Sequence, residues 1–375
     1  MPRLVLLLAV ALSGCVCLPI LGGPPPRDDE AAPVANLEDL ADLRGIVHCH
    51  SKLSHDCSGE FEDVADAAAE TSCSFVCFTD HLRHRNEVKD EPSGRIHGVL
   101  VLPGAELNCN GGSLLAIGVA AGIDRNLEAT KLVAQIRKLG GVAAIGHPEE
   151  WHLDNVADVD GCELFNLHAA ALAASKAGLV FRFFFFPPRP FFSALIERQD
   201  EACAVYDALD STRPLAAIGA CDAHEAALVD TYHRVFRAAT THVLVPSSRT
   251  GERLEAQDVL KALAEGRSYA ASELTQDATG FRFVARKADG SLAATLGGVA
   301  ALESGLALEV ALPAAGTITL LRDGAPALVV AKATKARFEP TVPGAYRVEA
   351  TYDGKPWIWS SAIRLTPPPR EAGGR

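Results

Sequence analysis

Two pairs of potential metal ligands stand far apart in this chain of 375 residues: His48 with His50, and Asp222 with His224. Residues two apart on a β-strand point to the same side, so each pair could offer both side chains to one site. Imidazoles and carboxylates ligate zinc, manganese and iron alike. Single candidates of the same types lie between the pairs: Asp56, His81, Glu106 and His147. The pattern predicts a site for several divalent ions, assembled from distant parts of the chain.

The candidates follow short apolar segments, at residues 45–47, 74–78, 98–102, 141–145 and 215–219. Apolar runs of this length are typical of buried parallel strands, whose C-terminal ends meet on one side of a sheet. Amphipathic stretches at residues 61–70, 127–139 and 194–209 predict helices between several of these strands. The alternation predicts an α/β barrel that carries its ligands at one end.

The motifs HCH, TDH, PGAE, GHP and DAH follow one another at residues 48–50, 79–81, 103–106, 146–148 and 222–224. Their order resembles that of the PHP superfamily of metal-dependent phosphoesterases, named after polymerase and histidinol phosphatase. With SHD at residues 54–56 and ELFN at 163–166, the chain also resembles an exported subgroup that includes carbamate-insecticide hydrolases. The resemblance covers roughly residues 44 to 285 and implies a distorted (β/α)7-type barrel.

The resemblance also implies three ion positions. The first ion would be surrounded by His48, His50, Glu106 and Asp222. Glu106 would bridge to a second ion held by His147, because the two oxygens of a carboxylate can bind different cations. A third ion would be held by Asp56, His81 and His224. His55 could take the place of Asp56, but the family spacing favours Asp56.

The segment after the bridging Glu departs from the family pattern. Many relatives carry a His there, where this chain has Ser113. The second position could therefore be weaker, use a water molecule or recruit another residue such as His168. We accordingly expect two or three divalent ions of zinc, manganese or iron.

The expected chemistry follows from the charges. Asp56, Glu106 and Asp222 supply three negative charges, so two divalent ions leave the ligand set near neutral and three leave it positive. Such a site attracts an anionic group although the chain has a formal charge of −12. We expect a hydrolase in which a metal-bound hydroxide attacks a small-molecule phosphate ester. Hydrolysis of a carbamate or carboxylic ester is one alternative, and a non-catalytic surface binding protein with a degraded metal site is another.

Several residues are candidates to assist. We expect Asp80, Glu106 and His224 to act in catalysis, and Asp80 could either orient a ligand ring or accept a proton. Asn166 could reach the site or cap a loop. Cations beyond the ligand positions could grip a phosphate or be ordinary solvated side chains: Lys52, Arg83 and His84.

The other histidines and the cysteines predict no separate site. His97, His152, His233 and His242 are expected on the surface or hydrogen-bonded in the core. The spacing of the ten cysteines does not indicate a disulfide framework, and most lie in apolar runs where Cys behaves as a small hydrophobic residue. Cys57 and Cys109 could pair or ligate.

The N-terminus predicts export. Residues 1–14 are expected to form a lipoprotein signal peptide, because Leu12-Ser13-Gly14-Cys15 follows an apolar stretch and resembles a bacterial lipobox. Cys15 would carry the lipid, and the Pro-rich residues 15–40 would tether the enzyme to a membrane of the bacterial cell envelope, facing the periplasm or the cell surface. A plain cleaved signal peptide is the alternative. The acidic chain has no Lys/Arg stripe, so a nucleic-acid duplex is not an expected partner.

The composition of the chain changes near residue 285. We expect the catalytic domain at residues 41–285, a small β-sandwich at 286–366 and a disordered tail at 367–375. Predicted strands lie at residues 306–312, 317–322, 336–339, 346–351 and 358–365. Residues 343–349 and 357–360 resemble the immunoglobulin-like tails of related exported PHP enzymes.

Two aromatic features leave alternatives open. Trp357 and Trp359 could form an aromatic platform or pack against the barrel. The Phe-rich segment from Phe181 to Phe192 could form a lid, touch lipid or pack in the core.

Overall fold

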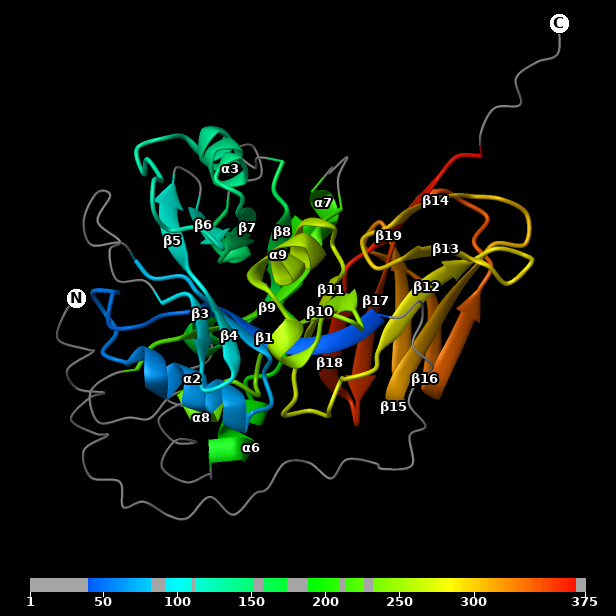
Figure 1. The fold of residues 1–375 in the computed structure, drawn as a ribbon. Coiled ribbons are helices and arrows are strands. Elements are labelled where there is room, and N and C mark those ends of the chain that lie inside the picture. The colour runs from blue at the N-terminus through cyan, green and yellow to red at the C-terminus, as the bar shows by residue number, and fades with distance from the viewer. Residues whose placement is uncertain are drawn as a thin grey trace, which may run out of the picture.

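Figure 1 shows a computed structural model of the chain, which describes residues 40–81, 92–109, 112–151, 158–173, 188–209, 214–225 and 232–368. The expected signal peptide, Cys15 and nearly all of the tether lie outside the described residues. The same holds for Arg83, His84, His152, residues 181–187 of the Phe-rich segment and the tail from residue 369. The predictions for these parts stay predictions.

A mixed sheet carries the predicted ligands (Figure 1). Its first strand, β1 (Leu40–Cys49), lies between β2 (Phe75–Phe78) and β9 (Ala216–Ala223) and is parallel to both. From β9 the parallel pairing continues to β8 (Gly161–Asn166) and β7 (Val142–Gly146), and β4 (Val99–Leu102) is parallel to β2. Every residue of β2, β4, β7, β8 and β9 is buried. This burial is typical of parallel strands covered on both faces, as the apolar runs predicted.

The alternation of strand and helix is interrupted in the middle of the sheet. Only Pro103 separates β4 from β5 (Gly104–Cys109), which forms an antiparallel hairpin with β6 (Gly112–Ile117), and β6 is antiparallel to β7. A bridge between Asp80 and Ala105 joins β5 back to the end of β2, so the strand pairings form a closed circuit. Gly104 allows this close approach, because a Cβ there would lie 2.3 Å from the carbonyl oxygen of Phe78. Glu106 therefore lies inside a strand rather than after one.

Two further strands extend β1. Its first half is antiparallel to β10 (Thr240–Pro246), which is antiparallel to β11 (Ser268–Ala271). Beyond β2 and β4, the short β3 (Gly94–Ile96) pairs with β4 in the antiparallel direction.

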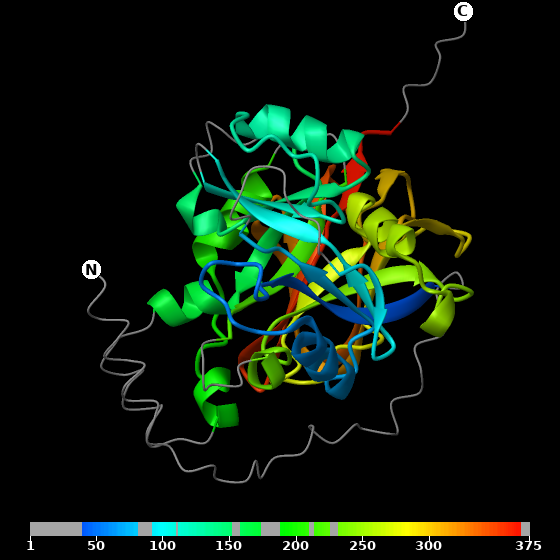
Figure 2. The same ribbon diagram turned by 60° about the vertical axis from the view of Figure 1, so that its left-hand side comes forward.

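Helices lie around this sheet (Figures 1 and 2). The predicted helix at residues 61–70 is α2 (Phe61–Glu70), and α3 (Ala129–Lys138) lies within the one predicted at 127–139. The helix predicted at 194–209 is wrong over residues 194–199, because α7 spans only Asp200–Ala208. Its first turn contains two acidic residues, which the positive end of the helix dipole favours. The other described helices are α4 (Leu167–Ala173), α6 (Pro188–Ser193), α8 (Tyr232–Val235) and α9 (Ala256–Ala264). None of the described helices is long and apolar enough to cross a bilayer.

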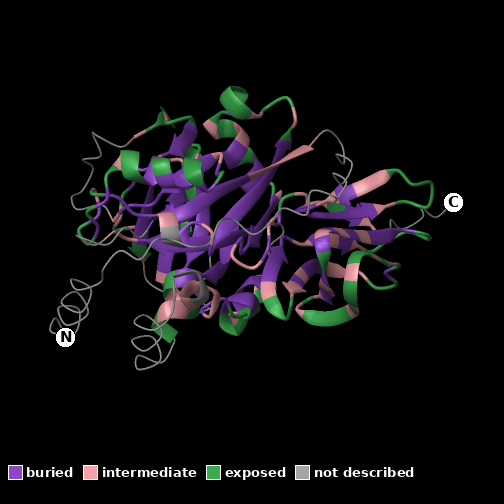
Figure 3. Cartoon of the chain, turned by 90° about the horizontal axis from the view of Figure 1, so that it is seen from below, coloured by how far each residue is buried: buried purple, intermediate pink, exposed green. Residues whose placement is uncertain are grey.

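The two faces of the sheet belong to two apolar cores. Along β2, Val76 and Phe78 pack into one core, while Phe75 and Cys77 pack into the other. The first core contains side chains of α2, α3 and α7, and the second contains those of α9. Figure 3 shows the buried strands in the interior and the exposed residues mainly on helices and turns. This double burial holds the strand ends, and the ligands on them, in fixed positions.

The C-terminal part is a second, antiparallel array of strands: β12 (Arg282–Arg286), β13 (Leu292–Thr295), β14 (Val299–Ala301), β15 (Ala307–Arg322), β16 (Ala325–Phe338), β17 (Gly344–Tyr352), β18 (Lys355–Ser360) and β19 (Ile363–Thr366). The strands predicted at 306–312 and 317–322 are one strand, β15, whose register with β16 shifts between Ala311 and Ile318. β14 and β19 are the exception to the antiparallel pairing. The boundary predicted near residue 285 falls within β12 and remains a prediction, as does the immunoglobulin-like sandwich.

Trp357 and Trp359 are both fully buried, so the exposed platform is wrong, and the predicted packing against the first domain holds for Trp359, which contacts Phe165. Trp357 lies in the core of the C-terminal strands and donates its indole N–H to the carbonyl oxygen of Gln276 at 2.6 Å. Trp359 stacks on Phe165 of β8, with ring centroids 5.3 Å apart and planes 9° apart. An extra residue in β18, opposite Ala350 and Thr351, lets the two indoles enter different cores. β18 thereby connects the C-terminal strands to the ligand-carrying sheet.

A buried polar network joins the start of β1 to β10, β11 and β12. His242 is fully buried and lies 2.9 Å from Asp42 through Nδ1 and 2.8 Å from Glu273 through Nε2. Tyr269 donates to Asp42 at 2.7 Å, and Arg282 lies 3.3 Å from the same carboxylate. The structure therefore confirms His242 as a hydrogen-bonded core residue.

We predict that this network makes stability depend on pH. Burial lowers the pKa of His242, but the charges of Asp42 and Glu273 outweigh it and raise the pKa from 6.5 to about 9. The folded pKa lies above the unfolded value, so the stabilisation is complete below pH 6.5 and disappears as pH rises through 9. The free energy of unfolding should fall by about 3 kcal/mol across this window. Urea denaturation from pH 6.5 to 9 tests this, and a His242→Gln variant with the same pH slope would contradict it.

Candidate metal centre

Three predicted ligands lie at backbone positions that residues other than glycine seldom occupy. The φ angles of His48, His147 and Asp222 are 64°, 47° and 48°, in the left-handed region. The register of β1 also shifts between Val47 and Cys49 in its pairings with β2 and β9. His48 and His50 therefore converge through a bulge and not through the regular alternation that the sequence predicted. Left-handed conformations at several residues of one centre are typical of functional sites.

His48, His50, Glu106 and Asp222 form one buried group, as the family resemblance implied. The Nε2 atoms of His48 and His50 lie 3.2 and 3.3 Å from Oε2 of Glu106. They lie 3.3 and 3.1 Å from Oδ1 of Asp222. Both Nε2 atoms and this Oδ1 are buried without a hydrogen-bond partner. Such atoms are costly to bury unless something else satisfies them.

The donor set and its spacing fit a divalent cation. Nitrogen and oxygen ligands lie about 2.1 Å from zinc, so neighbouring ligands of a tetrahedral ion are about 3.4 Å apart. The four nitrogen-to-oxygen separations of this group, from 3.1 to 3.3 Å, are close to that value. Zinc is one fitting ion, and manganese and iron accept the same ligand types.

Glu163 is a site residue that the sequence analysis did not single out. It is fully buried on β8, and its Oε1 accepts a hydrogen bond from Nδ1 of His48 at 2.5 Å. Its Oε2 accepts from the backbone N–H of His147 at 3.0 Å and from Nδ2 of Asn166 at 2.9 Å. A carboxylate on the far nitrogen of a histidine orients the ring and directs Nε2 toward a metal ion. The signal in the sequence was a Glu inside the apolar run of β8, because a buried carboxylate requires partners.

Asp80 has a comparable role toward His50. It is fully buried and accepts hydrogen bonds from the backbone N–H and hydroxyl of Ser51 and from the hydroxyl of Ser54. Ser54 in turn accepts from Nδ1 of His50 at 2.9 Å and from the backbone N–H of His81 at 2.8 Å. Asp80 therefore orients a ligand ring, that of His50 through Ser54, rather than the ring of its neighbour His81.

A second group lies at the more exposed rim of the centre and consists of His50, Asp56, His81 and His224. Oδ2 of Asp56 lies 3.7 Å from Nε2 of His81 and 3.6 Å from Nε2 of His224. The His224 ring stacks on that of His50, with centroids 4.0 Å apart. His55 belongs to neither group and is 68% exposed, so the geometry favours Asp56 over His55.

His147 approaches from the end of β7. Its Nε2 lies 3.6 Å from Oε1 of Glu106 and 3.2 Å from Oδ2 of Asp222. Ser113 donates its hydroxyl to Oε1 of Glu106. His168, on the first turn of α4, places Nδ1 2.6 Å from Oδ2 of Asp222 and forms a third group with Asp222 and His224.

The carboxylates impose a field that favours positive charge. Burial lowers the pKa of His48, but Asp222, Glu106 and Glu163 overcome this and raise it well above its usual value. For His147, burial is outweighed by hydrogen bonds to Asp222 and Glu149, which raise its pKa to about 11. In the opposite direction, burial and the neighbouring His50 lower the pKa of His224 to about 4. Protons or metal ions can supply the positive charge that this field stabilises.

The other candidate residues make structural contacts outside the ligand groups. Asn166 caps α4 by accepting from the backbone N–H of Ala169 at 3.0 Å, while its amide binds Glu163. Lys52 pairs with Glu60, and both side chains are half exposed. Cys57 lies 3.2 Å from the hydroxyl of Tyr232 and Cys109 faces the carbonyl of Gly112, and both are free thiols.

Comparison with solved structures gives a likeness to a two-domain bacterial protein. A solved structure from Bacteroides vulgatus, described as a two-domain protein containing a predicted PHP-like metal-dependent phosphoesterase, aligns with a TM-score of 0.41 at 15% sequence identity. The alignment covers 91% of this chain and 100% of that one. No protein-family model and no curated protein match the sequence.

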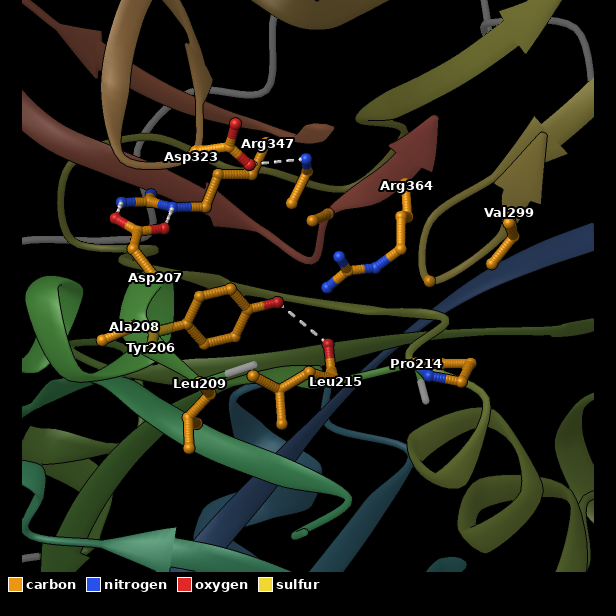
Figure 4. Close-up of a pocket in the computed structure, with 13 residues that line it drawn as sticks. Tyr206, Asp207, Ala208, Leu209, Pro214, Leu215, Val299, Asp323, Arg347 and Arg364 are labelled. Atoms are coloured by element: carbon orange, nitrogen blue, oxygen red, sulfur yellow. Dashed lines mark hydrogen bonds and ion pairs between the residues drawn. The ribbon is translucent and has the colours of Figure 1, made fainter. Parts of the chain in front are cut away.

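A pocket elsewhere in the molecule contains none of the candidate ligands. It lies between α7, the start of β9 and the C-terminal strands, and Tyr206, Pro214, Val299 and Arg364 line it (Figure 4). Two of its charged groups pair with each other, because Arg347 binds Asp207 through two hydrogen bonds of 2.6 and 2.7 Å. The His/Asp/Glu cluster, which could bind metal ions, is therefore the better candidate for chemistry.

Proposed function

We propose that this chain is a metal-dependent hydrolase of the PHP type, acting on an anionic phosphate ester. The observation that carries the proposal is the orientation of four imidazoles, each bonded at Nδ1 to an acceptor. The acceptors are Glu163 for His48, Ser54 for His50, Glu149 for His147 and the carbonyl of Asp222 for His224. This leaves four Nε2 atoms directed at the carboxylates, in the arrangement that metal ligands require.

The charges of the site support an anionic substrate. Divalent ions bound here would activate a water molecule and neutralise charge on the attacked group. Two divalent ions carry four positive charges and exceed the three negative charges of Asp56, Glu106 and Asp222, so the loaded site would attract an ester carrying negative charge. Asp56, His81 and His224 are partly exposed, which supports a substrate position at the rim. There the neutral ring of His224 can serve as a ligand, since its pKa is lowered to about 4.

Asp80 contributes to the proposed function by holding the ring of His50 in place through Ser54. Its two oxygens are held by Ser51 and Ser54 within the buried interior, away from the rim where we place the substrate. Through Ser54 it fixes the proton of His50 on Nδ1 and keeps Nε2 free for an ion. We therefore assign Asp80 to positioning a ligand rather than to accepting a proton from the substrate.

The proposal extends to architecture and location. We propose a distorted (β/α)7-type barrel over residues 41–285 and an immunoglobulin-like sandwich over 286–366. We also propose a lipid on Cys15 that anchors the protein in a bacterial cell envelope. The lipobox-like motif supports the anchor, and acyl labelling of the expressed full chain, with Cys15→Ser as the control, tests it.

Metal analysis combined with activity measurements tests the proposed function. The purified protein should contain about two or three divalent ions per chain and hydrolyse a chromogenic phosphomonoester or phosphodiester. A chelator should abolish turnover, and zinc, manganese or iron should restore it. Fewer than about two ions per chain, with no metal-dependent turnover, would contradict the proposal. Faster turnover of a carbamate or carboxylic ester than of either phosphate ester would redirect it to those substrates.

His50→Ala is the variant for the same test. It should abolish turnover and keep the circular dichroism spectrum, because it removes one ligand shared by two groups. His97→Ala, which removes a half-exposed surface histidine paired with Asp66, is the control and should keep full activity.

A further inference from the structure

We propose that His168 is a metal ligand and that Asp222, like Glu106, bridges two ions. This inference rests on the proposed metal-dependent function and adds a ligand from α4 to it. Ser113 on β6 offers no ligand to this ion, and the proposal gives that role to His168 on α4. The ion concerned lies on the Oδ2 side of Asp222.

The two oxygens of Asp222 face different imidazoles. Oδ1 lies 3.3 and 3.1 Å from Nε2 of His48 and His50. Oδ2 lies 3.2 Å from Nε2 of His147 and 2.6 Å from Nδ1 of His168. A carboxylate with nitrogen donors on both oxygens is arranged to bind one cation through each.

Glu106 divides its oxygens in the same way. Its Oε2 faces His48 and His50, while its Oε1 faces His147 at 3.6 Å. Ser113 adds no ligand on that side, because its hydroxyl donates to Oε1 of Glu106. Without His168, one imidazole and two carboxylate oxygens face the second ion. His168 adds a second imidazole beside Oδ2 of Asp222, and the two residues also form a group of possible ligands with His224.

Hydrogen bonds fix the start of α4, which carries His168. Asn166 caps the start of α4 and binds Glu163, which also holds the ring of His48 and the backbone of His147. One buried carboxylate thus connects the residues of both ion positions. His168 is 44% exposed, so its ring has room to adjust to an ion.

The experiment is a metal titration of wild type and His168→Ala, with metal content measured by mass spectrometry. We expect the wild type to bind an ion at each position and the variant to lose the ion on the Oδ2 side, with an affinity drop above about 100-fold. That threshold separates a ligand from an outer partner, whose loss costs about 10–100-fold. Cobalt-substituted samples add a spectroscopic readout, since the wild type should show coupling between the two ions that Asp222 bridges and the variant should lack that coupling. His97→Ala, equally exposed and also paired with an Asp, should behave as wild type.

The outcomes separate the inference from the proposed function. A wild type without bound metal would overturn both. A wild type with two coupled ions and a His168→Ala variant with the same content and spectrum would overturn the inference alone. His168→Asn keeps a donor for Asp222 but ligates poorly, so recovery of the second ion in that variant would also overturn the ligand role.

Discussion

Glu106→Gln should release the ions on both sides of that residue and lower turnover at least about 1000-fold. The carboxylate is buried, and its two oxygens face His48 and His50 on one side and His147 on the other. Glutamine has nearly the same shape but carries no charge, and its amide nitrogen cannot ligate. Metal ions contribute several kcal/mol to transition-state stabilisation, and each 1.4 kcal/mol corresponds to a factor of ten.

Metal content, turnover and the circular dichroism spectrum would be measured on this variant. Glu60→Gln, which neutralises a half-exposed carboxylate paired with Lys52, is the matched control and should keep its metal and activity. Excess metal should not restore the Glu106→Gln variant, because the bridge itself is missing. Full metal content with wild-type turnover would exclude Glu106 from the centre.

Glu163→Gln should weaken metal binding by about 10–100-fold and be rescued by excess metal. Glu163 accepts three hydrogen bonds, from His48, His147 and Asn166. The side-chain amide of glutamine would place its own N–H groups against at least one of these three N–H donors. The hydrogen bond that holds the ring of His48 or the backbone of His147 would then be lost. The ligands themselves remain, and the loss should therefore appear as affinity and not as maximal turnover.

Glu273→Gln separates this effect from general destabilisation. Glu273 is another fully buried carboxylate paired with a histidine, His242, but it lies in the polar network at the start of β1. Its replacement should lower the free energy of unfolding and leave the metal affinity of the folded protein unchanged. Equal metal affinities for Glu163→Gln and wild type would show that Glu163 does not position the ligands.

The resemblance of the motif order to the PHP superfamily implied which candidate ligands lie together, and the motifs that carry it are local features of the sequence. His48, His50, Glu106 and Asp222 form one group, and Asp56, His81 and His224 share another with His50. The reason given for the convergence of His48 and His50 was incomplete. Regular strand alternation was expected, whereas the structure has a bulge with His48 in a left-handed conformation.

The parts that could not be predicted depend on tertiary packing. The contact of His168 with Asp222 needs α4 to lie against the end of β9, and no local pattern encodes that. The partners Asp42 and His242 are separated by 200 residues, so their pairing follows from β1 and β10 being neighbours. The different cores of Trp357 and Trp359 depend on one extra residue in β18. Glu163 is the exception, since an acidic residue within an apolar strand is a readable signal.

The left-handed backbone at His48, His147 and Asp222 lowers the stability of the folded chain at residues that the proposed function requires. Each such residue costs the folded chain about 1–2 kcal/mol, and glycine would remove that cost together with the ligand. At these three positions, a substitution that relieves the backbone would therefore also remove a side chain that we propose binds metal. Directed evolution for heat resistance alone would erode this centre, and selection must include metal retention to preserve it.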